Sequence, residues 1–347
     1  MSDLEVCILP YRLRLVSIAK ESLPICAHTI IKLLLFPKEG KEFFSFTETP
    51  SNISLILDES GIDSFPGEAK VTVCPRVYLP FQILTGQSGT VPGLHSIAAP
   101  LADNDISILQ LSTYETDYTL IPEESVRKAL SCFPNTFVIR DELRLLEDVT
   151  LNISPSCSDG KRISTDGSSL SIQNQDCEVA KVEKSSPEMA TSEQVTNLRR
   201  VVTIPDCPVY VTSLAGSVEA VQDTMSIPLI HLLFFSNDRH RDDRFFSFTR
   251  TSESASLILS EPCLSLFPPG SLNFCDGAWS ILRIENTAFA FEQCGIVRDC
   301  TERLKGLGIS IFYLTTYHTV YLLVNQEDSQ TVVNALGHYY PLEMQEG

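Results

Sequence analysis

The stretch FFSFTETPSNISLILDESGIDSFP, residues 43–66, occurs twice in this chain of 347 residues. The second copy, FFSFTRTSESASLILSEPCLSLFP, covers residues 245–268 at a constant offset of 202, and the two copies agree at 13 of 24 positions without a gap. A second pair follows at an offset of 203, with ISILQLSTYETDY at 106–118 and ISIFYLTTYHTVY at 309–321. Self-similarity on this scale indicates a duplicated unit. We therefore expect two copies of one half, joined in the middle of the chain.

Hydrophobic periodicity predicts a strand, a helix and two strands at the start of each half, which is the front of a split βαβ unit. The first strand breaks at Pro10, and Ser22 is placed to cap the helix that follows. We expect the α+β class, with four tandem ferredoxin-like units of order βαββαβ arranged as two repeated halves. Beyond the quoted stretches, the expected strands are 5–19, 70–83, 106–111, 118–121, 136–139, 201–213, 278–285, 309–315 and 321–324. The helix expected after Ser22 has an apolar side formed by Ile25, Ile30, Ile31, Leu34 and Leu35. The other expected helices are 95–102, 123–132 after Pro122, 217–234, 294–307 and 329–336.

The middle of the chain has a different composition from the two halves. No aromatic residue occurs between Phe137 and Tyr210, and 151–194 holds ten serines. Such a segment cannot bury enough apolar surface to offset the entropy cost of ordering it, so we expect a flexible linker. The expected boundaries are 1–67 for unit one, 68–150 for unit two, 151–198 for the linker, 199–272 for unit three and 273–347 for unit four.

Composition and charge argue against several classes of protein. The formal charge of −18 argues against a nucleic-acid-binding protein, which needs a basic face for the phosphates, and it also disfavours binding to an anionic membrane surface. The longest apolar runs, such as 33–37 and 229–235, are far shorter than the roughly 20 residues that a membrane span requires. The first residues show no signal-peptide core. The eleven cysteines contain no CxxC pair, so we expect reduced thiols, no metal site and a location in the cytosol.

Motifs of catalysis are missing from the sequence. It contains no GxSxG elbow, Walker loop, GxGxxG turn or HExxH. The six histidines do not cluster, and acid pairs such as Asp242 and Asp243 lack a neighbouring apolar pocket by pattern. Cys294, before Gly295 at an expected helix N-terminus, is a candidate for a thiol of lowered pKa, although a small buried residue at a tight turn is the simpler interpretation. We expect neither an enzyme nor a cofactor.

Four segments carry a family likeness. HTIIKLLLFP, KEFFSFTETP, IAAPLADNDISILQLSTYETDY and FEQCGIV resemble the CASTOR family, the cytosolic arginine sensors of the TOR pathway, and the likeness covers nearly the whole chain except the linker. The resemblance implies four tandem ACT-type domains, a homodimer or a heterodimer with a paralogue, and an amino acid held between the second and fourth domains. It also implies that the unliganded protein binds and inhibits the GATOR complex, and that the ligand releases it.

The expected ligand site combines a strand-to-helix turn with a neighbouring strand edge. In ACT-like units the free backbone N–H groups of such a turn can hold an α-carboxylate. Here the turn is 290–297, in which Gly295 permits close approach of a ligand to the backbone. By resemblance, the amino-acid site is lined by Ser107, Ile108, Ala290, Gln293, Gly295, Ile296, Val297, Thr316, Tyr317, His318, Thr319 and Val320.

The expected partner site is the hairpin after strand 106–111. The family pattern Tyr-Gln-x-Asp matches Tyr114 and Asp117, with Glu115 in place of Gln. Hairpin tips present side chains outward, so the resemblance implies that these three residues contact the GATOR complex.

Two positions of the ligand site depart from the arginine-binding members, because Gln293 and Val320 stand where those members carry acids. A buried guanidinium without a carboxylate loses charge-assisted hydrogen bonds of roughly 1.5–3 kcal/mol each. The residues leave three hypotheses open: arginine as ligand, a neutral amino acid as ligand, or a ligand-independent paralogue that acts as a constitutive inhibitor or scaffold of GATOR.

Overall fold

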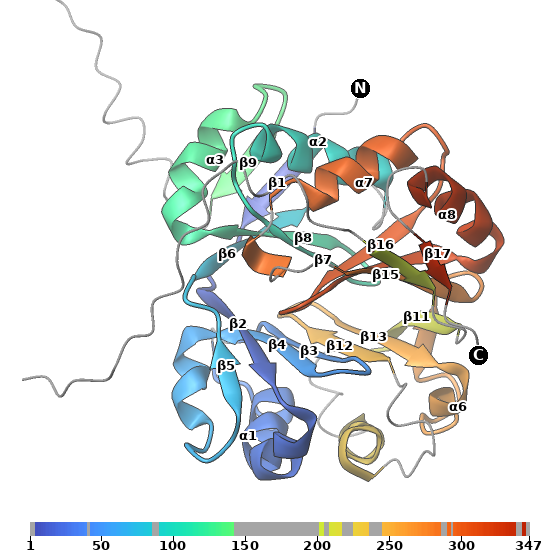
Figure 1. Cartoon of the computed structure of the whole chain (residues 1–347). Coiled ribbons are helices and arrows are strands. Elements are labelled where there is room, and N and C mark those ends of the chain that lie inside the picture. Colours follow the sequence, from blue (N-terminus) through green and yellow to red (C-terminus); the bar gives the residue numbers. More distant parts are fainter. Residues whose placement is uncertain are drawn as a thin grey trace, which may run out of the picture. The chain divides into compact units, whose positions relative to one another are not determined.

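The computed structural model describes residues 4–39, 42–84, 90–141, 201–204, 208–216, 225–235, 245–285, 290–292, 294–337 and 342–344. These residues fall within one compact unit, Met1–Arg144 with Arg199–Gly347 (Figure 1). The predicted linker 151–198, part of the helix predicted over 217–234 and the acid pair at 242–243 lie outside the described residues. No helix among those described is both long and apolar enough to cross a membrane.

The first half contains two runs of strands and helices in the predicted order. Its elements are β1 (Glu5–Ile8), β2 (Leu13–Ile18), η1 (Lys20–Ser22), α1 (Leu23–Leu35), β3 (Phe44–Glu48), β4 (Ile53–Asp58), η2 (Glu59–Ser64), β5 (Val71–Val73), β6 (Tyr78–Ile83), α2 (Val91–Ala102), β7 (Leu109–Ser112), β8 (Asp117–Pro122), η3 (Glu123–Ser125), α3 (Val126–Cys132) and β9 (Val138–Asp141). The first run pairs its strands in the order β3–β4–β2–β5. The second run pairs them as β7–β8–β6, and β1 lies between β6 and β9.

The second half repeats this plan. Its described elements are β10 (Val201–Ile204), β11 (Val209–Leu214), α5 (Ser226–Ile230), the π-helical η6 (His231–Phe235), β12 (Phe246–Arg250), β13 (Ala255–Ser260), α6 (Glu261–Leu264), β14 (Leu272–Phe274), β15 (Trp279–Glu285), η8 (Ala290–Glu292), α7 (Ile296–Leu304), β16 (Ile311–Thr315), β17 (Val320–Asn325), η9 (Gln326–Asp328), α8 (Ser329–Gly337) and β18 (Leu342–Met344). Its strands pair as β12–β13–β11–β14 and β16–β17–β15, and β10 lies between β15 and β18. The two halves therefore have the same topology.

The duplicated strands β3 and β12 join the two halves, and they lie side by side in Figure 1. They pair antiparallel, and Phe46 is opposite Phe248, which stands 202 positions later. Equivalent residues therefore meet on a local two-fold axis. Buried hydroxyl pairs flank that axis; Ser45 Oγ lies 2.9 Å from Thr249 Oγ1.

A second contact between the halves joins β7 to β16, and it follows the same local symmetry. The backbone N–H of Gln110 donates to Thr315 Oγ1 at 2.9 Å. The equivalent bond runs the other way, from the N–H of Tyr313 to Ser112 Oγ, also at 2.9 Å. With both contacts made, the strands form a closed sheet that runs β3–β4–β2–β6–β8–β7–β16–β17–β15–β11–β13–β12 and returns to β3.

Closure of the sheet buries both faces of many strands. One hydrophobic cluster takes a residue from every run, including Leu15, Tyr118, Ile258 and Phe312. A second cluster packs α1 and α5 over β3 and β12. Strands β3, β4, β8 and β12 are buried along their whole lengths, so the serines and threonines within these strands face protein and not water.

The first helix differs from its prediction in two details. Ser22 occupies the N-cap position, but its φ and ψ of −88° and −5° are helical because η1 runs directly into α1. A cap needs an extended backbone, and the Ser22 hydroxyl instead accepts the Lys70 N–H at 3.0 Å. Ile25, expected on the apolar face, is 45% exposed.

The helix expected over 123–132 is present as η3 followed by α3, and Pro122 before it ends β8 in extended conformation, with ψ of 131°. Two other predicted boundaries are wrong. The single strand expected over 70–83 is divided into β5 and β6, both of which pair with β2. The helix expected from Cys294 begins at Ile296.

Arg250 at the end of β12 is buried and connects the second half to α1. Its guanidinium donates to Leu33 O at 2.9 Å and to Leu34 O, and its Nε donates to Glu42 O at 3.2 Å. A cation is favourable at a helix C-terminus, where carbonyls lack partners in the helix. The equivalent position in β3 is Glu48, which is also buried, so the two copies have diverged to opposite charges.

We expect Arg250→Ala to destabilise the fold by about 2–4 kcal/mol, because it leaves buried carbonyls without donors. Urea unfolding followed by circular dichroism measures the change. Lys305→Ala is the control, since Lys305 makes a half-exposed ion pair with Glu302, and such pairs contribute about 0–1 kcal/mol. Equal stability of the two variants would contradict the structural role of Arg250.

Candidate functional site

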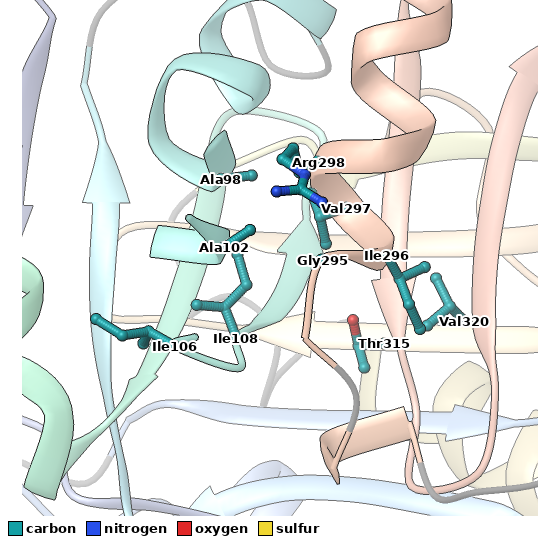
Figure 2. Close-up of a pocket in the computed structure, with 10 residues that line it drawn as sticks. All are labelled: Ala98, Ala102, Ile106, Ile108, Gly295, Ile296, Val297, Arg298, Thr315 and Val320. Atoms are coloured by element: carbon teal, nitrogen blue, oxygen red, sulfur yellow. The ribbon is translucent and has the colours of Figure 1, made fainter. Parts of the chain in front are cut away.

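A hollow lies where α2 and the segment after it meet the start of α7 and the start of β17 (Figure 2). Its volume is about 10 Å³, which is room for about one water molecule. Both halves of the chain contribute walls, and most of the lining is apolar. The lining residues are Ala98, Ala102, Ile106, Ile108, Gly295, Ile296, Val297, Arg298, Thr315 and Val320.

The start of α7 forms one wall, and Gly295 shapes it. Gly295 has φ of +86°, a left-handed conformation that side chains with a Cβ rarely adopt. A Cβ at this position would lie 4.0 Å from the Cβ of Ala102 across the hollow. The first bond of the helix runs from the Asp299 N–H to Gly295 O at 2.9 Å. The preceding N–H groups therefore lack partners within the helix and are available to an anionic group.

Arg298 is the one charged side chain among the described lining residues. Figure 2 shows its guanidinium reaching from α7 toward Ala98. Nη1 donates to Asp103 Oδ1 at 2.8 Å, and Nη2 donates to Asp299 Oδ1 at 3.1 Å. The Asp103 side chain is 65% exposed, so the first of these ion pairs is accessible to solvent.

Cys294, just before α7, makes hydrogen bonds from the α7 wall of the hollow to the wall formed by α2 and the segment after it. Its thiol donates to Ile106 O at 3.4 Å and more weakly to Ala102 O at 3.8 Å. Burial raises the pKa of the Cys294 thiol, and the carboxylate of Asp105 raises it further. The hypothesis of a thiol with lowered pKa is therefore wrong, because desolvation outweighs the helix N-terminus.

Five predicted site residues lie in the hollow: Ile108, Gly295, Ile296, Val297 and Val320.

Ser107 is partly buried between the lining residues Ile106 and Ile108 but is not itself part of the lining. Ala290 belongs to η8, and its side chain lies outside the described part of the chain, as does the whole of Gln293.

The predicted stretch 316–319 faces elsewhere, because Thr315 and Val320 form the last rung of β16 and β17 and the turn extends beyond the hollow. The Tyr317 N–H donates to Ser54 Oγ at 2.8 Å, and its ring packs against Phe291.

His318 Nε2 lies 3.3 Å from Ser17 Oγ of β2, and the Thr319 N–H donates to Thr316 Oγ1 at 3.1 Å. The structure therefore brings none of these four residues to the hollow.

Sequence reasoning did not single out Ala98, Ala102, Ile106, Arg298 and Thr315. Two signals pointed to part of this set. Ala98 and Ala102 stand four positions apart on one helix face, as small residues do where another segment approaches closely. Arg298 follows Gly295 by one helical turn, and Thr315 directly precedes the predicted turn.

The predicted partner residues occupy the β7–β8 hairpin and the start of β8. Glu115 is exposed, and Tyr114 is partly exposed. The Tyr114 N–H donates to Ser256 Oγ at 3.0 Å, which holds the hairpin against the second half. The expectation that all three side chains point outward is wrong for Asp117, which is 4% exposed because β8 begins there, in register with Ile83 of β6.

The corner related to the hollow by the local two-fold has different side chains. An offset of 203 relates His95 to Arg298 and Thr301 to Ala98. His95 Nδ1 lies 3.1 Å from Thr301 Oγ1, and Nε2 lies 2.9 Å from Glu302 Oε2. Burial lowers the pKa of His95, against the opposing effect of Glu302. A polar network thus occupies one corner while small apolar residues leave the other open.

The hollow has the chemistry of a binding site. Its lining holds no carboxylate, histidine or cysteine side chain among the described residues. The part of the chain that the structure describes also contains no group of three His, Cys, Asp or Glu residues that could hold a metal ion. Free amides, one guanidinium and apolar walls suit a small ligand that carries a carboxylate.

Two family profiles match segments of this chain. The profile of the ACT domain matches residues 74–134 and 275–337, which together contain every lining residue. The profile of the "Cytosolic arginine sensor for mTORC1 subunit 1 N-terminal domain" matches residues 12–71.

Similar proteins extend over nearly the whole chain. "Cytosolic arginine sensor for mTORC1 subunit 1" of Rattus norvegicus is 26% identical over 96% of both chains. The protein of the same name from Homo sapiens is 25% identical over 96% of this chain and 97% of its own. "Putative protein CASTOR3P" of Homo sapiens is 37% identical over 28% of this chain and 65% of its own.

We expect Cys294 to react slowly with iodoacetamide, because only the thiolate attacks and burial raises the pKa of this thiol. At pH 8 the alkylation rate of Cys294 should be lower than that of N-acetylcysteine. As the pH is raised, the rate for Cys294 should increase at a higher pH than the rate for the free thiol does. Mass spectrometry of the peptide that contains Cys294 measures the rate. Faster reaction than N-acetylcysteine at pH 7 would show a lowered pKa and contradict the prediction.

Proposed function

We infer from the similarity to the cytosolic arginine sensors for mTORC1, which confirms the resemblance to the CASTOR family, that this chain is a non-catalytic amino-acid sensor of the cytosol. In this proposal the unliganded protein binds and inhibits the GATOR complex. A free amino acid enters the hollow and releases the complex, which regulates TOR complex signalling. The observation that carries the proposal is a hollow whose walls come from two matched ACT domains.

We further propose that the chain contains four ACT-type domains, with the linker 151–198 between the second and the third. The expected boundaries 1–67, 68–150, 199–272 and 273–347 shift where the strand pairing requires it. Strands β5 and β14 complete the first and third domains, whereas β1 and β10 belong to the sheets of the second and fourth. The support is topological. Each of the four runs places its strands side by side in the order second, third, first. The fourth strand lies beyond the first strand. It is directly beside it in the first and third runs, and it is separated from it by β1 or β10 in the second and fourth runs. The hollow then lies between the second and fourth domains.

Ligand binding requires the walls to separate. Sites for small molecules typically have volumes of about 300–1,000 Å³, and the hollow has about 10 Å³. An amino acid therefore favours a more open arrangement of α2 and α7 over the closed one. The size of this population shift is set by the difference between its affinities for the open and the closed arrangement. This requirement is the physical basis of a switch.

A short path connects the hollow to the proposed partner surface. The wall residue Ile108 directly precedes β7, and β7 leads into the hairpin that carries Tyr114 and Glu115. We propose that these residues, with Asp117 as a buried support, contact GATOR. A shift of the wall would move the hairpin, because the intervening strand is only four residues long.

We propose that the chain forms a homodimer, or a heterodimer with a paralogue, through the exposed surface of α1 and α5. Four large apolar side chains on or next to these helices are exposed: Ile25 at 45%, Phe36 at 60%, Ile227 at 79% and Phe235 at 63%. The two helices pack over the same paired strands, so a second copy can cover both. Exposed apolar groups of this kind are typical of association surfaces.

We expect Gly295→Ala to abolish amino-acid binding, because the added methyl group enters the hollow and strains a left-handed residue. Isothermal titration of the wild type with all twenty amino acids, followed by the variant with the ligand found, measures the effect. Pull-down of GATOR with and without that ligand tests its release.

Gly270→Ala is the matched control, since Gly270 has φ of +77° and a Cβ added there would meet nothing within 4 Å. It carries the same backbone cost of roughly 1–2 kcal/mol, and we expect it to bind the ligand normally. Silence of the wild type toward all twenty amino acids, with constant binding of GATOR, would support the constitutive inhibitor instead.

A further inference from the structure

The charge of the hollow bears on which amino acid fits it. Among the described lining residues there is one guanidinium and no carboxylate. Most of the walls are apolar: Ile108, across from Gly295, is 9% exposed, and Val320, beside Ile296, is 3% exposed (Figure 2). A cationic ligand side chain would thus enter a low-dielectric space whose described lining offers it no carboxylate of its own, because the nearby Asp103 and Asp299 are already paired with Arg298.

The missing carboxylate is a property of this sequence and not a requirement of the fold. Val320 begins β17, and the residue related to it by the offset of 203 is Asp117, which begins β8. Asp117 is 4% exposed, so the equivalent strand accommodates a buried carboxylate at this position. The side of the molecule that carries the hollow has valine instead, which leaves its wall uncharged.

Arg298 is available to the ligand's carboxylate. Its bond to Asp103 is exposed, and exposed ion pairs contribute little, so a ligand carboxylate can replace Asp103 at small cost. The amides at the start of α7 offer further donors on the same side of the hollow. The α-carboxylate of an amino acid matches this set, and its side chain then lies against the apolar wall.

We propose that the hollow selects an amino acid with an uncharged side chain over arginine, with Arg298 binding the α-carboxylate and Val320 excluding a cationic side chain. This inference rests on the proposed sensor function and specifies its ligand class. A guanidinium that loses one or two charge-assisted hydrogen bonds binds more weakly by a factor between about 10 and about 10⁴.

Isothermal titration of the full chain with each of the twenty amino acids tests the preference. The tightest-binding uncharged amino acid should bind at least tenfold more tightly than L-arginine. Val320→Asp should raise the affinity for L-arginine at least tenfold, because it supplies the missing carboxylate. Val320→Asn is the matched control of nearly the same shape without charge, and it should leave the affinity for L-arginine unchanged.

Arg298→Met gives a second measurement that keeps the test open if Val320→Asp fails to fold. The Arg298 side chain is 37% exposed, and its loss should weaken the uncharged ligand at least tenfold with little change in melting temperature. Tighter binding of L-arginine than of every uncharged amino acid by the wild type would overturn the inference and leave the sensor function standing. Binding of no amino acid at all would overturn both.

Discussion

The antiparallel pairing of β3 with β12 is the constraint on which the rest of the structure depends. Phe46 lies opposite Phe248, its own equivalent, so the duplicated strand pairs with its copy around a local two-fold axis. With this register, the second run of strands in the first half, which contains β7, faces the second run in the other half, which contains β16. The pairing of β7 with β16 then closes the sheet and brings α2 against α7. The hollow lies where these two helices, one from each half, pack against each other.

Departures from the local symmetry give the two halves different roles. Symmetry alone would produce two equivalent corners between α2 and α7. In one corner His95 and Thr301 form a polar network, and in the other Ala98 and Arg298 line a hollow. Small residues leave space and larger hydrogen-bonded ones fill it, so divergence at a few equivalent positions is enough to restrict the hollow to one corner.

The walls of the hollow are held together by weak and exchangeable contacts. A neutral thiol of Cys294 donates to Ile106 O, and the exposed pair of Arg298 and Asp103 lies beside it. Such contacts contribute little free energy individually, so a ligand that supplies better partners can replace them. Elsewhere the halves are joined by buried hydrogen bonds, such as those of Arg250, which are costly to break. The hydrogen bonds beside the hollow are therefore weaker than those of Arg250 at the β3–β12 seam.

The sequence by itself determined the duplication, the order of strands and helices, and the similarity to the cytosolic arginine sensors, because repeats, periodicity and motifs are properties of short segments. Only the tertiary structure decided which side chains of those segments meet. It placed Arg298 in the hollow, turned Tyr317 toward Ser54, and buried Asp117 at the start of β8. The physical reason is that the register between distant strands sets these contacts, and that register is a compromise among packing, hydrogen bonds and closure of the whole sheet.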